Sequence, residues 1–365
     1  MLVGIMSMQR IDNYGSYLQA LGLKLTLESL GHKVIFVDYE VEKGISEQNW
    51  KNTSLLRRIR RFFRKPILDQ NYKETPYIHA DYPYLGMTEK RNYRSKVDVL
   101  IIGSDEVFNC LQRNPCVGYS LELLGARNKA RRLISYAASC GNLTIERLQK
   151  YNKQKEVAKY LCKFNALSVR DANTYNVVKK LTNKDIQYHL DPVLISEYGD
   201  LFVDTVKEQD YILVYGYPSR FSEEEGKIIR EYANSRNKKL ISMCGKQSFC
   251  DEYIACSTLE VLSYFKHADS IITDTFHGSI FSTLVHKPFV AFIRPTEQYG
   301  YGNEEKLGDL LIRLKLESRG IYDVNQLVET METPIDYTET DRIRQKERKR
   351  SLEFLERELG RVENE

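Results

Sequence analysis

Short apolar runs alternate with polar turns and amphipathic segments along most of the chain. The first unit has an apolar run at 2–8, a polar loop at 9–15, a segment of helical periodicity at 16–31 and an apolar run at 33–39. A strand, a helix and a strand in this order form the βαβ unit of parallel sheets. The N-terminal part is therefore predicted to be an α/β domain.

The first half of the chain continues with apolar runs at 97–105, 131–139, 165–171 and 188–195. Continuous apolar runs are typical of parallel strands that are buried on both faces. The first three of these runs are therefore predicted to be strands. The fourth is expected to be a shorter strand or an extended connection.

A second series begins near residue 210, with helical patterns at 222–237 and 258–268 between its apolar runs. These runs lie at 211–217, 238–245, 269–275 and 287–293. Two such series predict an α/β fold of two doubly wound, Rossmann-like domains that face a cleft. The ligand of such a fold lies at the carboxyl ends of the strands.

The two series also set the expected domain limits. The N-terminal domain is predicted to span 1–205, and the C-terminal domain 206–340. Residues 341–365 are charged and helix-forming, and this helix is expected to pack back on the N-terminal domain.

Composition excludes several classes of protein. The chain of 365 residues is 42% hydrophobic and 28% charged, as in a soluble globular protein. Its net charge of +4 comes from 54 basic and 50 acidic residues, so no nucleic-acid partner is expected. Neither a run of eighteen apolar residues nor a signal-peptide pattern occurs, which predicts a cytoplasmic protein.

Short motifs for metals and nucleotides are missing from the sequence. The seven cysteines include no CxxC pair, which predicts reduced thiols rather than a zinc site or a disulfide framework. Neither GxGxxG nor GxxxxGK[ST] occurs, which weakens a dinucleotide or ATP-binding interpretation. We therefore predict no metal and no cofactor.

Residues 54–68, SLLRRIRRFFRKPIL, mix arginine and lysine with large apolar residues and contain no acid. A basic amphipathic helix of this kind is typical of contact with an anionic membrane surface. Its alternative interpretation is a solvated helix between the domains. The first interpretation predicts peripheral contact with the inner face of the membrane.

Three polar residues follow predicted strands, and the first is Asp105. Ser104, which precedes it, is expected to bind substrate. Asp105 could serve as a carboxylate of the site, or it could cap a following helix. The second is Arg170, whose planar guanidinium suits bidentate binding of carboxylate or phosphate. Its alternative is a surface ion pair with Asp171.

The third is His277, within IITDTFHGSIFST at 271–283, between a predicted strand and a predicted helix that starts at Gly278. A helix N-terminus attracts anions, and histidine titrates near neutral pH. The alternatives are a capping histidine or one buried against Asp274. The neighbours that are predicted to bind substrate are Asp274, Thr275, Gly278 and Ser279.

The N-terminal loop DNYGSYLQ supplies further candidates, since it leads into a predicted helix. Free backbone amides at a helix start can hold a phosphate or a sugar hydroxyl. We therefore expect Asn13, Gly15 and Ser16 to bind substrate.

Taken in order, these stretches resemble the polysaccharide pyruvyl transferases. The matching segments are NYGSYLQAL, DVLIIGSDEVFN, SYAASCG, LSVRDANT, LDPVL, ADSIITDTFHGSIFSTLVHKPFVAF and KLGDLLIRLKLESR. The resemblance implies a two-lobed fold like that of the GT-B glycosyltransferases. It also implies transfer of the pyruvyl group of phosphoenolpyruvate, as a cyclic ketal, to a sugar of a bacterial capsular or exopolysaccharide precursor.

The family's catalytic positions fall on His277, Arg170 and Asp105. We expect Arg170 to grip the phosphate or carboxylate of the donor, and His277 to act as general acid or to bind the leaving phosphate. Asp105 would receive a hydroxyl proton. The N-terminal domain would hold the sugar or lipid-linked acceptor, and the C-terminal domain the phosphoenolpyruvate.

The sequence departs from the family pattern at a few positions. Thr275 stands where some members have an arginine, and Glu106 and Phe108 stand where many have glutamine and tryptophan. Arg294, just after the next predicted strand, is a candidate for the missing positive charge. Two alternatives to a pyruvyl transferase stay open, a nucleotide-sugar glycosyltransferase and a noncatalytic adaptor that residues 54–68 bring to membranes.

Overall fold

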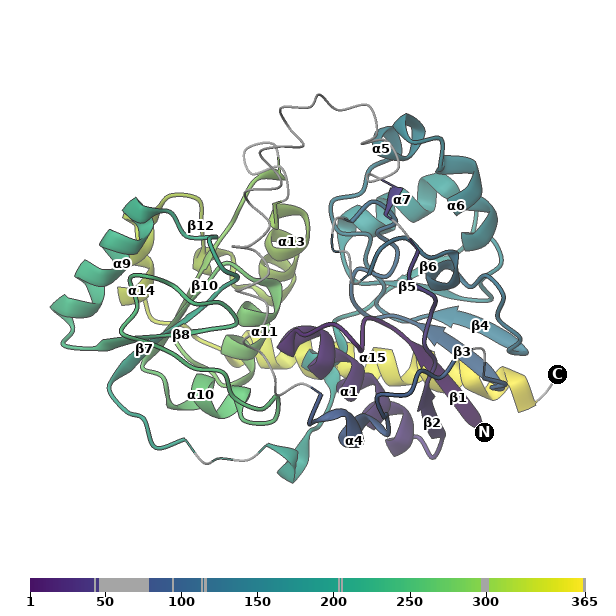
Figure 1. The fold of residues 1–365 in the computed structure, drawn as a ribbon, viewed down its shortest axis with the longest axis horizontal. Coiled ribbons are helices and arrows are strands. Elements are labelled where there is room, and N and C mark those ends of the chain that lie inside the picture. The colour runs from purple at the N-terminus through teal and green to yellow at the C-terminus, as the bar shows by residue number, and fades with distance from the viewer. Residues whose placement is uncertain are drawn as a thin grey trace.

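The structure is a computed structural model with two α/β halves (Figure 1). The residues that it describes are 1–42, 44–45, 79–93, 95–112, 114, 117–202, 204, 206–296 and 302–363. The basic segment 54–68 lies outside the described residues. Among the described helices, none is long and apolar enough to cross a membrane.

The N-terminal sheet is parallel, in the order β2-β1-β3-β4. These strands are β1 Leu2–Met6, β2 Lys33–Phe36, β3 Val99–Ile102 and β4 Arg132–Ser135. A parallel pair, β5 (Leu167–Val169) and β6 (Ile186–Tyr188), extends the β4 edge through two isolated bridges. The strand order reverses between β1 and β3, where folds of this type bind their ligands.

The C-terminal sheet has 6 parallel strands in the order β12-β11-β10-β7-β8-β9. They are β7 Tyr211–Tyr215, β8 Lys239–Met243, β9 Glu252–Tyr253, β10 Ser270–Thr273, β11 Phe289–Phe292 and β12 Gly320–Ile321. Counted within this half, the order is that of the Rossmann fold, with the reversal between β7 and β10. The predicted doubly wound arrangement is confirmed in both halves.

Helices cover both sheets and connect their parallel strands (Figure 1). In the N-terminal half they are α1 Tyr14–Ser29, α4 Tyr82–Leu85, η2 Leu121–Leu124, α5 Ile145–Lys150, α6 Gln154–Leu161, α7 Ala172–Leu181, α8 Pro192–Ile195 and η3 Gly199–Leu201. In the C-terminal half they are α9 Glu223–Ser235, α10 Val261–His267, α11 Phe276–Leu284, α13 Glu304–Leu314, η4 Glu317–Arg319, η5 Val324–Gln326 and α14 Leu327–Glu332, followed by α15 Thr338–Glu363. Figure 1 places α1 and α11 beside one another where the halves meet.

Two element predictions need correction. The run at 188–195 is a strand only at its start, because Asp191 caps a helix that begins with Pro192. Proline has no amide hydrogen to lose at the first position of a helix, and aspartate accepts from the free amides there. The helix after β10 begins at Phe276 rather than Gly278, because Thr275 is its cap.

The C-terminal helix α15 lies against the N-terminal half (Figure 1). Glu358 accepts from Arg132 at 2.5 Å, and both side chains are buried. Phe354 packs on the ring of His189, with 4.7 Å between the ring centres. Near its start, the Thr340 hydroxyl donates to the Leu314 carbonyl of the C-terminal half at 2.9 Å. This helix therefore ties the two halves together.

His189, beneath α15, makes folding sensitive to acid. Burial, together with the charges of Arg350, Arg313 and Arg357, lowers the pKa of His189 to about 3. In the unfolded chain the imidazole of His189 would bind a proton near pH 6.5, whereas in the folded chain it stays unprotonated at that pH. Stability should therefore fall as pH drops from 6.5 toward 3, by about 2 kcal/mol between pH 6.5 and 5. Urea unfolding at both pH values measures this loss.

The control for this prediction is His189→Gln, which removes the titrating ring. The loss on acidification should be about 2 kcal/mol smaller in the variant than in the parent protein. An equal loss in both proteins would show that His189 is not the acid-sensitive group.

Candidate active site

Two helix N-termini meet where the halves touch. Asn13 caps α1, with its side chain accepting from Ser16 at 3.0 Å, and Thr275 caps α11, accepting from Gly278 at 2.8 Å. A Cβ built on Gly15 would lie 2.1 Å from Nδ1 of His277, so the imidazole rests directly on the backbone of α1. Helix N-termini carry partial positive charge, and two of them here favour an anionic ligand.

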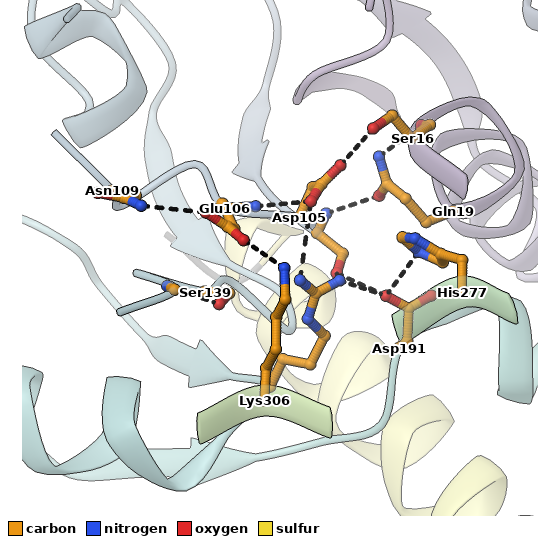
Figure 2. Close-up of polar contacts among 12 residues, drawn as sticks. Ser16, Gln19, Asp105, Glu106, Asn109, Ser139, Asp191, His277 and Lys306 are labelled. Carbon is orange, nitrogen blue, oxygen red and sulfur yellow. Dashed lines mark hydrogen bonds and ion pairs between the residues drawn. The ribbon is translucent and has the colours of Figure 1, made fainter. Parts of the chain in front are cut away.

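His277 lies in the first turn of α11 and is 8% exposed. Its Nε2 is 3.7 Å from an oxygen of Asp191 and, although it is buried, has no hydrogen-bond partner in the described part of the chain. The rings of Phe276 and Phe281 border the imidazole. The alternative interpretation, in which His277 is buried against Asp274, is wrong, because the carboxylate near the imidazole is that of Asp191 (Figure 2).

Arg170 is buried between two carboxylates. Its Nη1 donates to Asp191 at 2.7 Å, its Nη2 lies 3.7 Å from Asp105, and Phe276 packs against its guanidinium. Burial alone would lower the pKa of Arg170, but the charges of Asp191, Asp105 and Asp171 raise it. Arg170 is therefore a charged group inside the protein, not a surface partner of Asp171.

The carboxylate of Asp191 is charged despite full burial. Burial raises its pKa, but the interactions with His277, the charge of Arg170 and the amide of Val193 together hold the pKa well below its ordinary value. A carboxylate in this state stabilises positive charge on its neighbours. Asp191 is therefore suited to support a protonated His277.

Asp105 lies opposite the start of α1. One oxygen accepts from the hydroxyl of Ser16 at 2.6 Å (Figure 2), and the other accepts from the amide of Glu106 at 2.9 Å. Its backbone has φ 75°, the left-handed region that aspartate tolerates better than most residues. No helix starts at Asp105, so it is not a helix cap. Its carboxylate is in place to take a proton from a hydroxyl.

The backbone that carries Asp105 is fixed by buried polar groups. Gln19 accepts from the amide of Ser104 at 3.1 Å and donates to the hydroxyl of Ser7 at 2.9 Å. The Ser104 hydroxyl donates to Ala137 at 2.8 Å and to Asp191 at 3.2 Å. Ser104, predicted to bind substrate, therefore holds the carboxylates in position.

Lys306 brings a positive charge from the C-terminal half. Its Nζ donates to Glu106 at 2.5 Å (Figure 2), and the other oxygen of Glu106 accepts from Asn109 at 3.0 Å. Lys306 was not among the residues predicted from the sequence. A lysine in the first turn of α13, where the helix dipole disfavours a cation, is the signal that could have found it.

Several residues that were predicted to bind substrate shape the turn before α11. The side-chain oxygen of Thr275 caps α11 by accepting from the amide of Gly278. The hydroxyl of Ser279 donates to the Thr275 carbonyl at 3.3 Å. A Cβ on Gly278 would lie 2.1 Å from the Thr273 hydroxyl, so glycine allows the close turn. These groups position His277.

Arg294 does not join the cluster around His277. Its guanidinium pairs with Glu225, at 3.1 Å for one of the contacts, and lies between the rings of Phe221 and Phe292. Asp274 instead accepts from Nε of Arg220 at 2.7 Å. The predicted replacement charge at Arg294 is thus already balanced by a carboxylate.

The carboxylates of the cluster outnumber its basic groups. Asp105, Glu106 and Asp191 face Arg170 and Lys306, so these five groups carry one more negative than positive charge. In the described part of the chain, no group of three His, Cys, Asp or Glu side chains could hold a metal ion. The arrangement is suited to proton transfer next to a bound anion.

Comparison with known proteins gives one family. A family model described as polysaccharide pyruvyl transferase matches residues 13–294. No curated protein matches significantly.

Solved structures give distant likenesses. The glycotransferase of kitacinnamycin is 12% identical, with 98% of each chain covered and a TM-score of 0.47. The UDP-GlcNAc 2-epimerase from Neisseria meningitidis, bound to UDP-GlcNAc, is 8% identical, with 99% of each chain covered and a TM-score of 0.47. No activity is carried over from either.

Proposed function

The chain belongs to the polysaccharide pyruvyl transferase family, and we propose that it moves the pyruvyl group of phosphoenolpyruvate to a sugar as a cyclic ketal, releasing phosphate. The acceptor would be a sugar of a bacterial capsular or exopolysaccharide precursor, free or lipid-linked. The observation that carries the proposal is the buried Nε2 of His277, which lies beside a charged carboxylate and at two helix N-termini and has no hydrogen bond to any described residue.

The reaction needs one proton for carbon and two hydroxyl groups for the ketal. The methylene carbon of the donor takes a proton and becomes a methyl group, while positive charge develops at the neighbouring carbon. One sugar hydroxyl bonds to that carbon, the carbon–oxygen bond to phosphate breaks, and a second hydroxyl completes the ring. Of the two hydroxyl protons, one replaces the proton given to carbon and the other leaves on phosphate.

His277 supplies the proton for the methylene carbon in this scheme. Asp191 stabilises the imidazolium before transfer, since its carboxylate is charged and lies 3.7 Å from Nε2. Asp105, oriented by the Ser16 hydroxyl, takes the proton of the attacking sugar hydroxyl. A general acid and a general base thus stand on opposite halves of the protein.

The two basic residues of the cluster take different roles. Arg170 is paired with Asp191 and Asp105, so we assign to it the positioning of these carboxylates in place of a grip on the donor. Lys306 is 19% exposed and has further donors, so it can shift from Glu106 toward the negative charge of the donor.

Gly15→Ala tests whether activity depends on the close packing of the His277 imidazole on the backbone of α1. The added methyl would collide with the imidazole, and a displacement near 1 Å is expected to lower kcat about 100-fold. The control is Gly308→Ala, because among the described residues no atom outside the neighbouring backbone of its own helix lies within 4 Å of a Cβ there. Both variants are compared by phosphate release and by thermal unfolding. Equal activity in the two would show that the contact between Gly15 and His277 is not needed.

The donor is the property that decides between the proposed function and its alternatives. Purified protein is incubated with oligosaccharide acceptors and either phosphoenolpyruvate or UDP-sugars, and released phosphate and UDP are measured. The proposal predicts acceptor-dependent phosphate release from phosphoenolpyruvate. Release of UDP alone would favour a glycosyltransferase, and no turnover of any donor would favour a noncatalytic adaptor.

A further inference from the structure

Arg220 offers free hydrogen-bond donors at the edge of the C-terminal sheet. It lies in the loop after β7, and its Nε donates to Asp274 at 2.7 Å. Within the described ranges, no hydrogen bond or ion pair involves its two terminal nitrogens, and its side chain is 26% exposed. The guanidinium is therefore fixed at its base while its outer fork is open.

The other guanidinium groups near this edge are already occupied. Arg170 uses both terminal nitrogens on Asp191 and Asp105. Arg294 uses its terminal nitrogens on Glu225 and on the carbonyl of Arg220. Arg294 thus helps to hold the Arg220 loop and cannot also grip a ligand without leaving Glu225.

Arg220 also lies close to both helix N-termini of the site. Asp274, its partner, directly precedes the cap of α11. Its guanidinium carbon is 5.9 Å from the centre of the Tyr217 ring, and the hydroxyl of Tyr217 accepts from Asn13, the cap of α1, at 2.9 Å. This place, between β7 and β10, is where the strand order reverses and ligands bind in such sheets.

The charge balance of the site requires such a group. The cluster around His277 carries three carboxylates against Arg170 and Lys306, so it has no surplus positive charge for an anionic donor. Asp274 already balances Arg220, but within the described residues the pair leaves both N–H₂ groups without a hydrogen bond. A planar fork of this kind matches two oxygens of a phosphate.

We propose that Arg220 is the phosphate-binding residue of this site, with Nη1 and Nη2 on two phosphate oxygens while Nε stays on Asp274. The identity of the phosphate as that of phosphoenolpyruvate rests on the proposed function. The phosphate-binding role itself does not, because inorganic phosphate would fill the same fork.

The test is calorimetric titration of inorganic phosphate, pyruvate and phosphoenolpyruvate into wild type, Arg220→Gln and Arg220→Lys. Loss of a charged hydrogen-bonded pair should weaken phosphate binding about 10- to 100-fold in Arg220→Gln. Arg220→Lys, which keeps the charge without the fork, should fall between. The KM for phosphoenolpyruvate should rise by a similar factor, with a smaller change in kcat, while pyruvate binding stays unchanged.

The matched control is Arg236→Gln. Arg236 lies on the surface at the end of α9 and pairs with Glu332. The control variant should bind phosphate as wild type does, and thermal unfolding shows whether each variant is folded. If Arg220→Gln and Arg220→Lys both bind phosphate like wild type, the inference is wrong. The inference is also wrong if the Arg220 variants lose binding of pyruvate but keep binding of phosphate. The guanidinium of Arg220 would then bind a carboxylate.

The two proposals fail separately. If wild type binds phosphate through Arg220 but neither binds nor consumes phosphoenolpyruvate, the phosphate site stands and the proposed function is wrong. If wild type consumes phosphoenolpyruvate and phosphate binding is independent of Arg220, the function stands and the inference is wrong.

Discussion

Replacing His277 by glutamine should lower kcat for phosphate release from phosphoenolpyruvate by about 10²- to 10⁴-fold. Glutamine has a similar size and can make hydrogen bonds, but it has no proton to give at neutral pH. Because His277 is buried at the start of α11 and its Nε2 has no hydrogen bond to the described residues, the substitution breaks no hydrogen bond of that atom among them. The fold should therefore survive, and steady-state kinetics with a thermal unfolding control measures the effect.

A second histidine gives the matched comparison. His79 is 52% exposed at its side chain and packs on Tyr82, near the same end of α1 but outside the cluster. His79→Gln should keep kcat within about twofold, as expected for a surface substitution. Full activity in His277→Gln, with an intact fold, would remove the general acid from the mechanism.

Arg170→Met should lower the free energy of unfolding by about 3–5 kcal/mol, the loss expected when one partner of a buried ion pair is removed. The variant leaves Asp191 buried without the guanidinium that donates to it at 2.7 Å. Asp105 also loses its neighbour at 3.7 Å. Denaturant unfolding at neutral pH measures the loss.

The double variant Arg170→Met with Asp191→Leu is the control. Replacing both partners by apolar groups removes the unpaired charge, so the double variant should be more stable than Arg170→Met alone. A loss below about 1 kcal/mol in Arg170→Met would indicate a weakly engaged arginine. Such a result would favour the original expectation that Arg170 grips the donor.

Acid should act on the same ion pair. The pKa of Asp191 is held below its ordinary value in the folded protein, so the stabilising contribution is present above a pH of about 3.9 and is lost on further acidification. His189, whose pKa is also lowered, loses its contribution earlier, below a pH of about 6.5. The two groups therefore act in different pH ranges.

Much of the architecture could be predicted from the sequence, because buried parallel strands leave continuous apolar runs. Asp105, Arg170 and His277 all follow such runs, and the structure brings them together through Asp191. Asp105 and Arg170 follow strands of the N-terminal half whose carboxyl ends lie at a common edge, so they are neighbours regardless of their separation in sequence. His277 follows β10 of the other sheet and reaches Asp191 because the two halves meet there.

The partners of these residues could not be predicted in the same way. Asp171, next to Arg170 in the sequence, caps α7, because its side chain accepts from the amide of Thr174 at 2.7 Å. Asp191, which Arg170 contacts instead, comes from the start of α8. A cap and an ion-pair partner have the same residue type, and only the fold assigns each aspartate to one role.

The cation nearest to the turn at Thr275 could not be predicted either. Arg294 and Arg220 both follow strands of the C-terminal sheet, so sequence position does not separate them. In the structure, Arg294 forms an ion pair with Glu225, whereas Arg220 pairs with Asp274 through Nε and keeps its terminal nitrogens available within the described residues. Membrane contact through 54–68 and the placement of acceptor and donor on separate domains stay predictions.

In the proposed reaction, the protein builds a pyruvyl ketal on a sugar. The most direct measurement is mass spectrometry and NMR of the acceptor after incubation with phosphoenolpyruvate and purified protein. We expect an acceptor whose mass has increased by one pyruvyl ketal, with one phosphate released for each product and with product formed about 10²- to 10⁴-fold more slowly by His277→Gln. An acceptor extended by a sugar from UDP-sugar, with phosphoenolpyruvate unconsumed, would contradict the proposed reaction.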